Sequence, residues 1–416
     1  MFTLPDVLPI RKQVEITTEI LRTRLDQILP RAMREAEMDM WLIICQEDAL
    51  DPIYKTMIPM DTWPKVLQIL IFFDQGKECG IEKINLSMTD THDLYQKPWR
   101  GGNPPDQWRL LSHIIEERDP KRIGINIGDV NWAAGGLTHT LYHQLVRNMP
   151  EIYISRLVSA ETACTLWGMT LTGEELDLYP SIVSLARRII TQVYAAAIPD
   201  QTTLDDLEWA FWQICAQNHL EQSFKPYYSL QRSDLEAKKY PAADRILRRG
   251  DLLVCDVGIR YLGLFTDHQE LAYVRHTGES DAPDGLKRLL ATSNRLQDIF
   301  MREFQHGLSG NQLLENIQSA AKEANISSPY IFSHSLGLFV HEPGPVIGLP
   351  WDQSPIAGRG DVKLEYNTCF AMELAHLGTV PEWNNQRVGC QTEQMVQFTK
   401  DGCALINGRQ TEFHLI

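Results

Sequence analysis

Acidic residues interrupt apolar segments at four places in the second half of this chain, and a histidine lies between them. Each acid stands in or beside a run expected to form a strand, where an unpaired carboxylate is costly unless it is paired or bound to a metal. Four carboxylates carry four negative charges, which two divalent cations would neutralise. The candidate metal ligands are Asp256, Asp267, His334, Glu373 and Glu393.

The types of these side chains indicate which cations would suit them. Hard carboxylates with one imidazole suit Mn(II), Co(II), Fe(II) or Zn(II), and disfavour sites that prefer thiolates. In a two-metal hydrolase, a hydroxide held between the cations attacks the substrate, and the cations stabilise the developing oxyanion. The five residues therefore indicate a dinuclear hydrolytic centre.

The first two acids lie on an expected hairpin. Asp256 ends the apolar run 252–255, Gly258 and Gly263 mark the turn region, and Asp267 lies on the return strand. Two carboxylates on neighbouring strands repel each other unless a cation sits between them. Taken alone, the pattern fits one acid at a strand end and one exposed acid equally well.

The remaining candidates follow in three short segments. His334 and His341 are seven residues apart in the segment 333–343, so one could bind metal and the other could contact substrate. Glu373 interrupts an apolar strand, and Glu393 opens another. Each residue alone is more often structural, and only the combination favours a metal centre.

The order of these segments resembles a known family. The matching segments are DVGIRYLGLFTD, SHSLGLFVHEP, FAMEL and QTEQMV, preceded by DRILRRGD at 244–251. They resemble the pita-bread metallopeptidases, namely methionine aminopeptidase, aminopeptidase P and prolidase. The first ~160 residues resemble the creatinase-type N-terminal domain. The resemblance implies an α+β fold: an α/β domain over residues 1–165, then over residues 166–416 a pita-bread domain whose curved antiparallel sheet is flanked by helices.

The resemblance also implies a role for each ligand. Asp256 would bind one metal, and His334 and Glu373 would bind the other. Asp267 and Glu393 would bridge the two. Manganese is the first expectation for both ions, with cobalt, zinc or iron as alternatives.

Two residues would act on the substrate. By resemblance, Glu373 would also carry the proton from the bridging water to the leaving amine, and His341 would contact the substrate near the scissile bond. The implied activity is that of an Xaa-Pro aminopeptidase or dipeptidase, in which a metal-bridging hydroxide attacks a peptide bond near the substrate's N-terminus.

The chain departs from the family pattern at two positions. Lys239 falls where family peptidases carry a histidine, and Gln391 falls where proline-specific members carry an arginine, with Arg387 nearby. These departures bear on Xaa-Pro specificity. They leave open a non-peptidase hydrolase or lyase that acts on a small molecule through the same site, and a binding module on the same fold.

Composition limits the partners. The 416 residues carry a net charge of −15, which disfavours nucleic acid and anionic membranes. Eight cysteines without a CxxC pair favour a reducing compartment. With no signal peptide in view, we expect a cytoplasmic protein, although a removed leader would leave the same sequence. By resemblance, the partners are a peptide or dipeptide substrate and a second copy in a homodimer.

Periodicity predicts the elements that position the candidate residues. In the first domain, helices and apolar strands alternate, which indicates a mixed or parallel sheet covered by helices. The second domain begins with two amphipathic helices and then alternates strands and helices. The expected helices are 11–38, 108–117, 174–197, 204–218, 286–303 and 311–325, and the expected strands are 39–45, 66–73, 122–127, 251–257, 270–275, 370–374 and 393–399.

Overall fold

The computed structural model describes residues 4, 6–341 and 343–416. Glu342, which belongs to the segment containing the two candidate histidines, lies outside the described residues, as do residues 1–3 and 5. The chain forms two compact units. One is Pro9–Glu174, and the other is Glu175–Ile416 together with residues 4 and 6–8. The sequence placed the border between residues 165 and 166.

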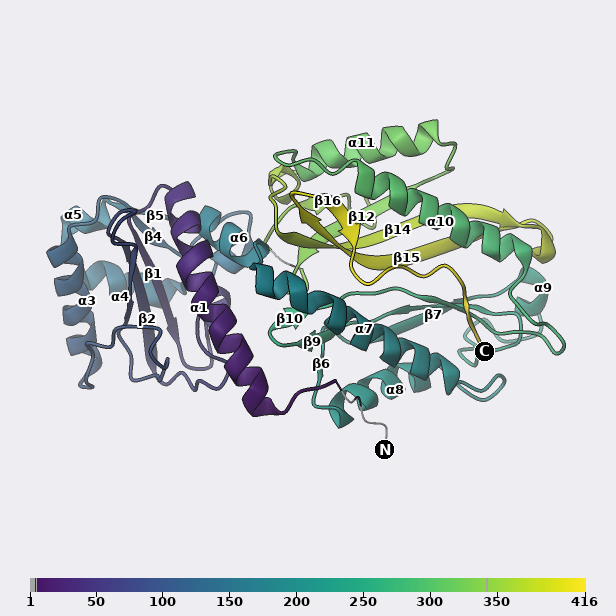
Figure 1. Ribbon diagram of the computed structural model, residues 1–416, viewed down its shortest axis with the longest axis horizontal. Helices are drawn as coiled ribbons and strands as arrows, with labels where there is room; N and C mark the ends of the chain where they lie inside the picture. Colours follow the sequence, from purple (N-terminus) through teal and green to yellow (C-terminus); the bar gives the residue numbers. More distant parts are fainter. Residues whose placement is uncertain (1–3, 5, 342) are drawn as a thin grey trace. The chain divides into compact units, whose positions relative to one another are not determined.

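A five-stranded mixed sheet forms the centre of the N-terminal unit (Figure 1). Its order is β3-β2-β1-β4-β5, with β1 antiparallel to β2 and parallel to β4. The mixed sheet agrees with the expectation from sequence, although the short outer strands β3 and β5 carried no clear signal. The strands are β1 (Met40–Gln46), β2 (Leu67–Asp74), β3 (Ile81–Asn85), β4 (Ile123–Ile125) and β5 (Leu157–Ser159).

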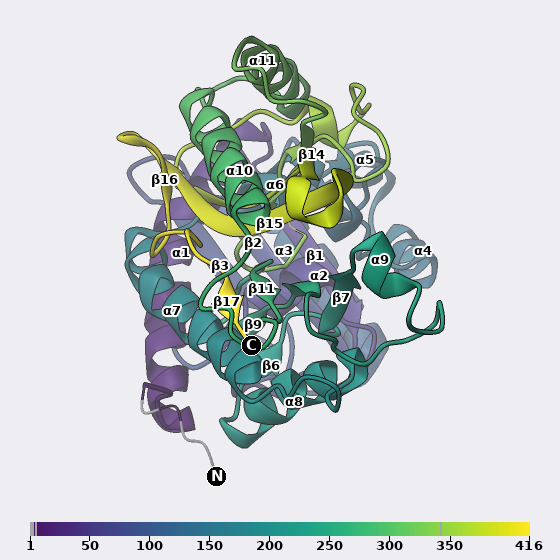
Figure 2. The same ribbon diagram turned by 90° about the vertical axis from the view of Figure 1, so that its right-hand side faces the viewer.

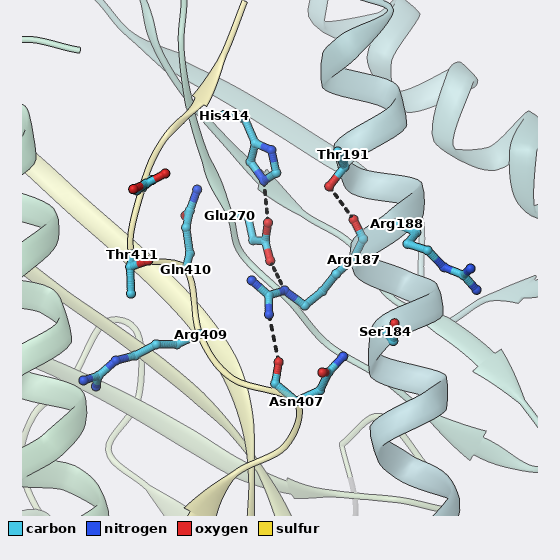
Figure 3. A pocket seen from close by; sticks show the side chains of 11 residues that line it. Ser184, Arg187, Arg188, Thr191, Glu270, Asn407, Arg409, Gln410, Thr411 and His414 are labelled. Atoms are coloured by element: carbon cyan, nitrogen blue, oxygen red, sulfur yellow. Dashed lines mark hydrogen bonds and ion pairs between the residues drawn. The ribbon is translucent and has the colours of Figure 1, made fainter. Parts of the chain in front are cut away.

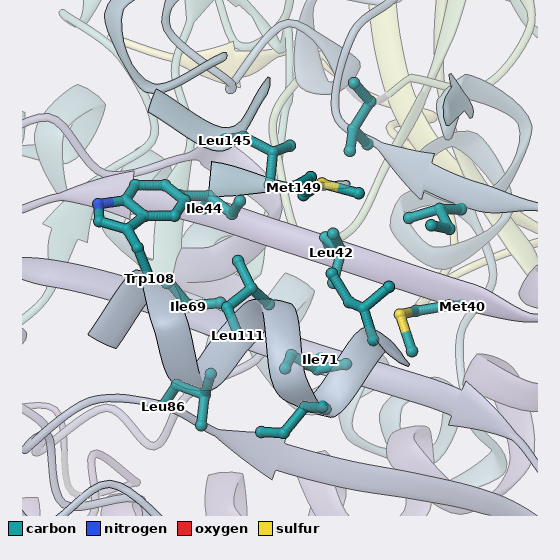
Figure 4. Close-up of a cluster of buried hydrophobic side chains, with 14 of the residues drawn as sticks. Met40, Leu42, Ile44, Ile69, Ile71, Leu86, Trp108, Leu111, Leu145 and Met149 are labelled. Carbon is teal, nitrogen blue, oxygen red and sulfur yellow. The ribbon is translucent and has the colours of Figure 1, made fainter. Parts of the chain in front are cut away.

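Helices cover both faces of this sheet, which explains why β1 is apolar along its length. Alternate β1 residues, among them Leu42 and Ile44, pack against Trp108 and Leu111 of α3 and Leu145 of α4 (Figure 4). The helices are α1 (Ile10–Glu35), α2 (Pro52–Thr56), α3 (Pro104–Arg118), α4 (His139–Asn148), α5 (Glu151–Ile154) and α6 (Glu161–Met169), with a 3-10 turn η1 (Trp132–Ala134).

The C-terminal unit contains three antiparallel or mixed sheets. The largest has the order β13-β12-β14-β15-β16, the second β17-β11-β8-β7 and the third β10-β9-β6. The strands are β6 (Glu221–Gln222), β7 (Tyr227–Gln231), β8 (Leu252–Asp256), β9 (Ile259–Tyr261), β10 (Leu264–Phe265), β11 (Leu271–Tyr273), β12 (Tyr330–Leu336), β13 (Val346–Ile347), β14 (Thr368–Val380), β15 (Gln386–Thr399), β16 (Gly402–Leu405) and β17 (His414–Leu415).

The predicted hairpin is present, and its two strands extend through both the β8–β11 and the β9–β10 pairs. Antiparallel pairing joins β8 to β11 and β9 to β10, and the bridge between Val257 and His268 continues the same register between them. The turn is Leu262-Gly263, and both residues have positive φ (52° and 82°), as a two-residue type I′ turn requires. The hairpin therefore fixes how every residue between 252 and 273 faces its opposite strand.

Helices pack on two sides of these sheets. Figure 1 and Figure 2 both show α10 and α11 over the β14–β15 sheet, and α7 and α8 on the far side of the hairpin strands. Aromatic and aliphatic side chains of α10 and α11, such as Phe300 and Leu313, form one core with Phe370 and Val396. The helices are α7 (Gly173–Ala195), α8 (Leu204–Gln217), α9 (Asp234–Ala237), α10 (Asp284–Arg302) and α11 (Gly310–Glu323), with 3-10 turns η2 (Arg359–Asp361) and η3 (Pro381–Trp383). Among the described residues, no helix combines the length and apolar character needed to cross a membrane.

A buried ion-pair network holds the start of β8. The Arg232 guanidinium donates to both carboxylate oxygens of Asp251, at 2.6 and 2.7 Å, and to Asp244 at 3.0 Å. Asp251 is fully buried, and the ring of Tyr240 lies against the same guanidinium. Because Asp251 lies five residues before Asp256, this network sets where the first candidate ligand stands.

We expect Arg232→Met to destabilise the C-terminal unit by about 3–5 kcal/mol, because removing the arginine leaves a buried aspartate without its partner. Denaturant unfolding of the purified variant measures the change. Arg249→Met is the matched control, since Arg249 is exposed and donates to the Arg275 carbonyl; it should stay within about 0.5 kcal/mol of the unaltered protein. Equal stabilities for the two variants would contradict a structural role for the network.

Candidate metal centre

Strand register brings three of the candidate acids into one row. Glu373 of β14 lies directly opposite Glu393 of β15, and Glu393 is bridged to Gln269 by two backbone hydrogen bonds of 3.1 Å. Continuing the hairpin register places Gln269 opposite Asp256. Directly opposed residues present their side chains on the same face, so the row runs from Asp256 through Gln269 and Glu393 to Glu373.

The other two candidates occupy the next row on the same face. A step of two residues along the hairpin strands from the row of Asp256 and Gln269 pairs Gly258 with Asp267. The same step along β14 from Glu373 reaches Ala371, which pairs with His334 of β12. A Cβ added at Gly258 would lie 1.9 Å from the Thr266 carbonyl oxygen, so only glycine fits opposite Asp267. Small neighbours thus leave room for the acid and the imidazole.

Interatomic distances group these side chains around Asp267. Ligand atoms of Asp256, Asp267 and Glu393 lie within 4.8 Å of one another, and so do those of Asp267, His334 and His341. Asp267 belongs to both groups, as a residue that bridges two cations would. Glu373, directly opposite Glu393, faces the same cluster. Its charge therefore raises the pKa of both Asp267 and Glu393.

Burial raises the pKa of every acid in the cluster, and repulsion by other carboxylates adds to it at Asp267, Glu373 and Glu393. Burial raises the pKa of Asp256 to about 6 and that of Glu373 to about 7. Burial, together with the charges of neighbouring carboxylates, raises the pKa of Asp267 and Glu393 well above the ordinary values. Without cations, the cluster therefore retains protons at neutral pH.

Unpartnered oxygen atoms show that these residues fit a pair of divalent cations. Among the described residues, no hydrogen-bond donor reaches Oδ1 of Asp267 or either carboxylate oxygen of Glu393, although all three atoms are buried. Buried acceptors of this kind need a partner. Divalent cations would be such partners, and two of them would balance the four negative charges. The carboxylates and the imidazole therefore fit a dinuclear metal site.

The two histidines lie side by side at one edge of the cluster. The ring of His334 is 4.4 Å from that of His341, at 80°, and His334 Nε2 is 3.7 Å from a carboxylate oxygen of Asp267. Burial lowers the pKa of His334 to about 3 and lowers that of His341, and the positive charge of Arg359 lowers both further. Both imidazoles are therefore neutral at pH 7, as metal or substrate contacts require.

Contacts on the face opposite the cluster hold the return strand of the hairpin. Glu270, next to Gln269, points the opposite way and accepts from Arg187 Nε of α7 at 2.6 Å and pairs with His414 of β17 (Figure 3). Tyr194 donates to the Glu270 carbonyl at 2.9 Å. These contacts anchor the strand to α7 and to the C-terminal strand.

The structure also places the residues that depart from the family pattern. Lys239 follows the short helix α9, where its ammonium lies 2.6 Å from Glu236. Gln391 is exposed on β15, opposite Ala375, and Arg387 is exposed further along, opposite Thr379. Two residues that face the cluster, Gln269 and Arg359, were missed from sequence. For Gln269 the signal was available, because it stands at the alternate strand position after Asp267.

The sequence profile of metallopeptidase family M24 matches residues 181–400, more than half of the chain. The chain belongs to this family. The C-terminal unit has its pita-bread fold, so the resemblance and the fold class inferred from sequence are confirmed. A search of curated protein sequences finds no match.

Solved structures share the fold across nearly the whole chain. X-Pro aminopeptidase from Thermotoga maritima has a TM-score of 0.66 at 16% identity, and the match covers 93% of this chain and all of that one. Xaa-Pro dipeptidase from Bacillus anthracis has a TM-score of 0.61 at 16% identity, covering 97% and 100%. Dipeptidase PepE from Mycobacterium ulcerans has a TM-score of 0.62 at 17% identity, covering 96% and 98%.

The raised pKa values give the metal-free protein a predicted pH dependence. The ordinary values are 3.8 for Asp and 4.5 for Glu, so between about pH 4 and 7 the folded state binds more protons than the unfolded state. The free energy of unfolding should therefore fall as pH rises through this window. Asp256→Asn removes one of the titrating groups and should flatten the fall. Thermal unfolding of both proteins in chelator across this range tests it, and parallel curves would contradict it.

Proposed function

We propose that this protein is a dinuclear metal-dependent peptidase that cleaves near the N-terminus of its substrate, as an Xaa-Pro aminopeptidase or dipeptidase does. The observation that carries the proposal is the buried cluster of four carboxylates and one imidazole in two adjacent rows on one face. Membership of a metallopeptidase family and the shared fold support it.

The grouping of the side chains supports a bridging role for Asp267, and the other ligand roles are those that the family resemblance implies. Asp256 would hold one cation, His334 and Glu373 the other, and Asp267 and Glu393 both. Manganese fits this donor set, as do cobalt, zinc and iron. When bound, two such cations activate water as a nucleophile and stabilise the negative charge that develops on the scissile carbonyl.

Glu373 would serve as the proton carrier. It is half-buried, and burial raises its pKa to about 7 in the metal-free protein. A carboxyl group whose pKa lies near the working pH both accepts and donates a proton readily. Cations bound beside Glu373 would lower this pKa, so the carboxylate would be ionised and able to take a proton from water and pass it to the leaving amine.

His341 and Arg359 would orient the peptide. His341 stands at the exposed edge of the cluster, beside the more deeply buried His334, so its neutral imidazole can donate to a substrate carbonyl. The positive charge of Arg359 acts on both histidines and would attract a substrate carboxylate. A short peptide with a free C-terminus satisfies both residues.

A second candidate is a non-peptidase hydrolase or lyase that uses the same metal centre. Lys239 and Gln391 favour it, because they stand where proline-specific peptidases carry a histidine and an arginine. Lys239 is a point charge held by Glu236 and lacks the proton-transfer ability of an imidazole near neutral pH.

Chelator-sensitive hydrolysis tests the proposal. We expect the manganese-loaded protein to cleave at least one class in a panel of Xaa-Pro dipeptides, longer Xaa-Pro peptides and non-proline dipeptides. Asp267→Asn and Glu393→Gln should each lower kcat by at least about 100-fold, because loss of a ligand costs more than loss of a residue that supports one. Release of the N-terminal amino acid, followed by chromatography, is the measurement.

The control variant is His306→Gln, an exposed histidine that pairs with Glu365 away from the cluster. It should retain the activity of the unaltered protein. Cleavage confined to non-proline peptides would mean that Lys239 and Gln391 have changed specificity. No cleavage of any peptide by protein shown to hold metal would favour the second candidate.

A further inference from the structure

The N-terminal unit carries an exposed pair of histidines on one helix. His139 and His143 of α4 are four residues apart, and their Nε2 atoms lie 3.0 Å from each other. The opposite side of α4 packs into the core through Leu141 and Leu145, so both imidazoles face solvent. Their rings meet edge to face, with centroids 4.3 Å apart.

This spacing suits two ligands of one cation. Zinc–nitrogen bonds are about 2.0–2.1 Å long, so two imidazoles bound to one ion at angles between a right angle and a tetrahedral one have nitrogens about 2.8–3.4 Å apart. The observed 3.0 Å lies in this range. Both atoms are thus already at the separation of neighbouring ligands, and only the ring orientations would need to adjust.

The pairing of these histidines also differs from that of three other exposed histidines. His92, His113 and His306 each pair with a carboxylate, namely Asp61, Glu117 and Glu365. In the part of the chain that the structure describes, the partner of each α4 histidine is the other imidazole. Imidazole ligands without a carboxylate favour copper, nickel and zinc over manganese.

We propose that His139 and His143 form a surface site for a borderline divalent cation such as Ni(II), Cu(II) or Zn(II). The site is bidentate and leaves coordination positions open to solvent or to a further ligand. It differs from the carboxylate cluster in its donors, which would make the two sites select different metals.

Retention of untagged protein on immobilised Ni(II) tests this site, because a metal fixed to a resin reaches only exposed imidazoles. We expect the unaltered protein to be retained, and His139→Ala and His143→Ala each to elute at a several-fold lower imidazole concentration. His113→Ala, which removes an exposed histidine from the neighbouring helix α3, is the control and should elute with the unaltered protein. Elution of all four proteins together would overturn the proposal.

A second inference concerns Gln269, a neutral residue among the candidate metal ligands. Gln269 occupies the row position between Asp256 and Glu393, and it is the one member of that row without a charge. Its Nε2 lies 3.4 Å from Oδ2 of Asp256, and its side-chain amide opposes the rise in the pKa of Glu373 that burial causes. Its backbone is bridged to Glu393. Through its side chain and its backbone, Gln269 therefore touches the cluster at more than one carboxylate residue.

Two more buried glutamines extend this contact to helix α10. Gln394 Nε2 donates to the Gln269 carbonyl at 3.3 Å, and Gln297 of α10 donates to the side chain of Gln394 and, at 3.2 Å, to Thr392. All three glutamines are at most 4% exposed. Thr392 and Gln394 flank Glu393, so the chain fixes the backbone on both sides of this acid.

We infer that Gln297, Gln394 and Gln269 are positioning residues that hold the carboxylate cluster in the arrangement that binds metal. The inference rests on the proposed metal centre. An uncharged donor fits the middle of the row, because it satisfies carboxylate oxygens without adding a fifth negative charge. Gln297 acts through the two residues that flank Glu393, namely Thr392 and Gln394.

Metal affinity measured by calorimetry with Mn(II) tests the inference apart from activity. Residues that support metal ligands typically contribute 10–100-fold to affinity, so we expect Gln297→Met and Gln269→Met to weaken binding by about this factor. Methionine keeps the volume of the side chain and removes its hydrogen bonds. Gln107→Met is the control, since Gln107 is an equally buried glutamine of the N-terminal unit that donates to the carbonyls of Leu67 and Leu86.

The outcomes separate this inference from the proposed function. Tight binding by the unaltered protein and by the Gln107 control, with weak binding by the other two variants, supports it. Equal affinities in all four proteins would overturn it while leaving the metal centre intact. Failure of the unaltered protein to bind any of Mn(II), Co(II), Fe(II) and Zn(II) would overturn the proposed function and the inference together.

Discussion

Repulsion between buried carboxylates is the constraint on which the C-terminal unit depends. Glu373 and Glu393 stand directly opposite each other on paired strands, and Asp256 and Asp267 lie within the same few ångströms. Like charges in opposed strand positions destabilise a sheet, and burial makes each charge more costly. Without cations the chain answers by retaining protons, as the raised pKa values of all four acids show. The fully ionised cluster would therefore need divalent cations to balance its charges, and the rest of the unit must hold the acids in place.

Strand register and buried contacts hold the four acids close together. The type I′ turn at Leu262-Gly263 sets the register of the hairpin, and Gly258 lets the two hairpin strands approach closely opposite Asp267. The paired charges around Arg232 fix the start of β8, and the contacts of Glu270 hold the return strand from behind. Asp256, His334, Glu373 and Glu393 lie on strands, and Asp267 lies between β10 and β11 in the same hairpin register, so sheet hydrogen bonds oppose rotations that would separate the acids.

Much of this arrangement could be predicted from the sequence, because acids inside apolar strands are conspicuous. The interrupted runs at Asp256 and Glu373 marked both the strands and the candidate ligands, and the hairpin followed from the glycines after Asp256. The strand that carries His334 was not predicted, because its polar and apolar residues do not alternate clearly and its pairing with β14 joins segments far apart in sequence. For the same reason β14 is longer than the apolar stretch 370–374 suggested: β12 and β15 extend it on both sides. Arg359 lies in an irregular segment, and only the folded chain brings its charge near the histidines.

Gln269 illustrates what sequence reasoning could have added. Once the hairpin is accepted, period-two alternation puts residue 269 on the same face as Asp267 and opposite Asp256, so a polar residue there must meet the cluster. A carboxylate at this position would add a fifth negative charge to a set already balanced by two divalent cations. An apolar residue would leave the neighbouring oxygens without a donor. A neutral amide avoids both costs, and the buried glutamines behind it keep its backbone in place. The chemistry of the cluster therefore constrains residues that bind no metal, and this constraint reaches as far as helix α10.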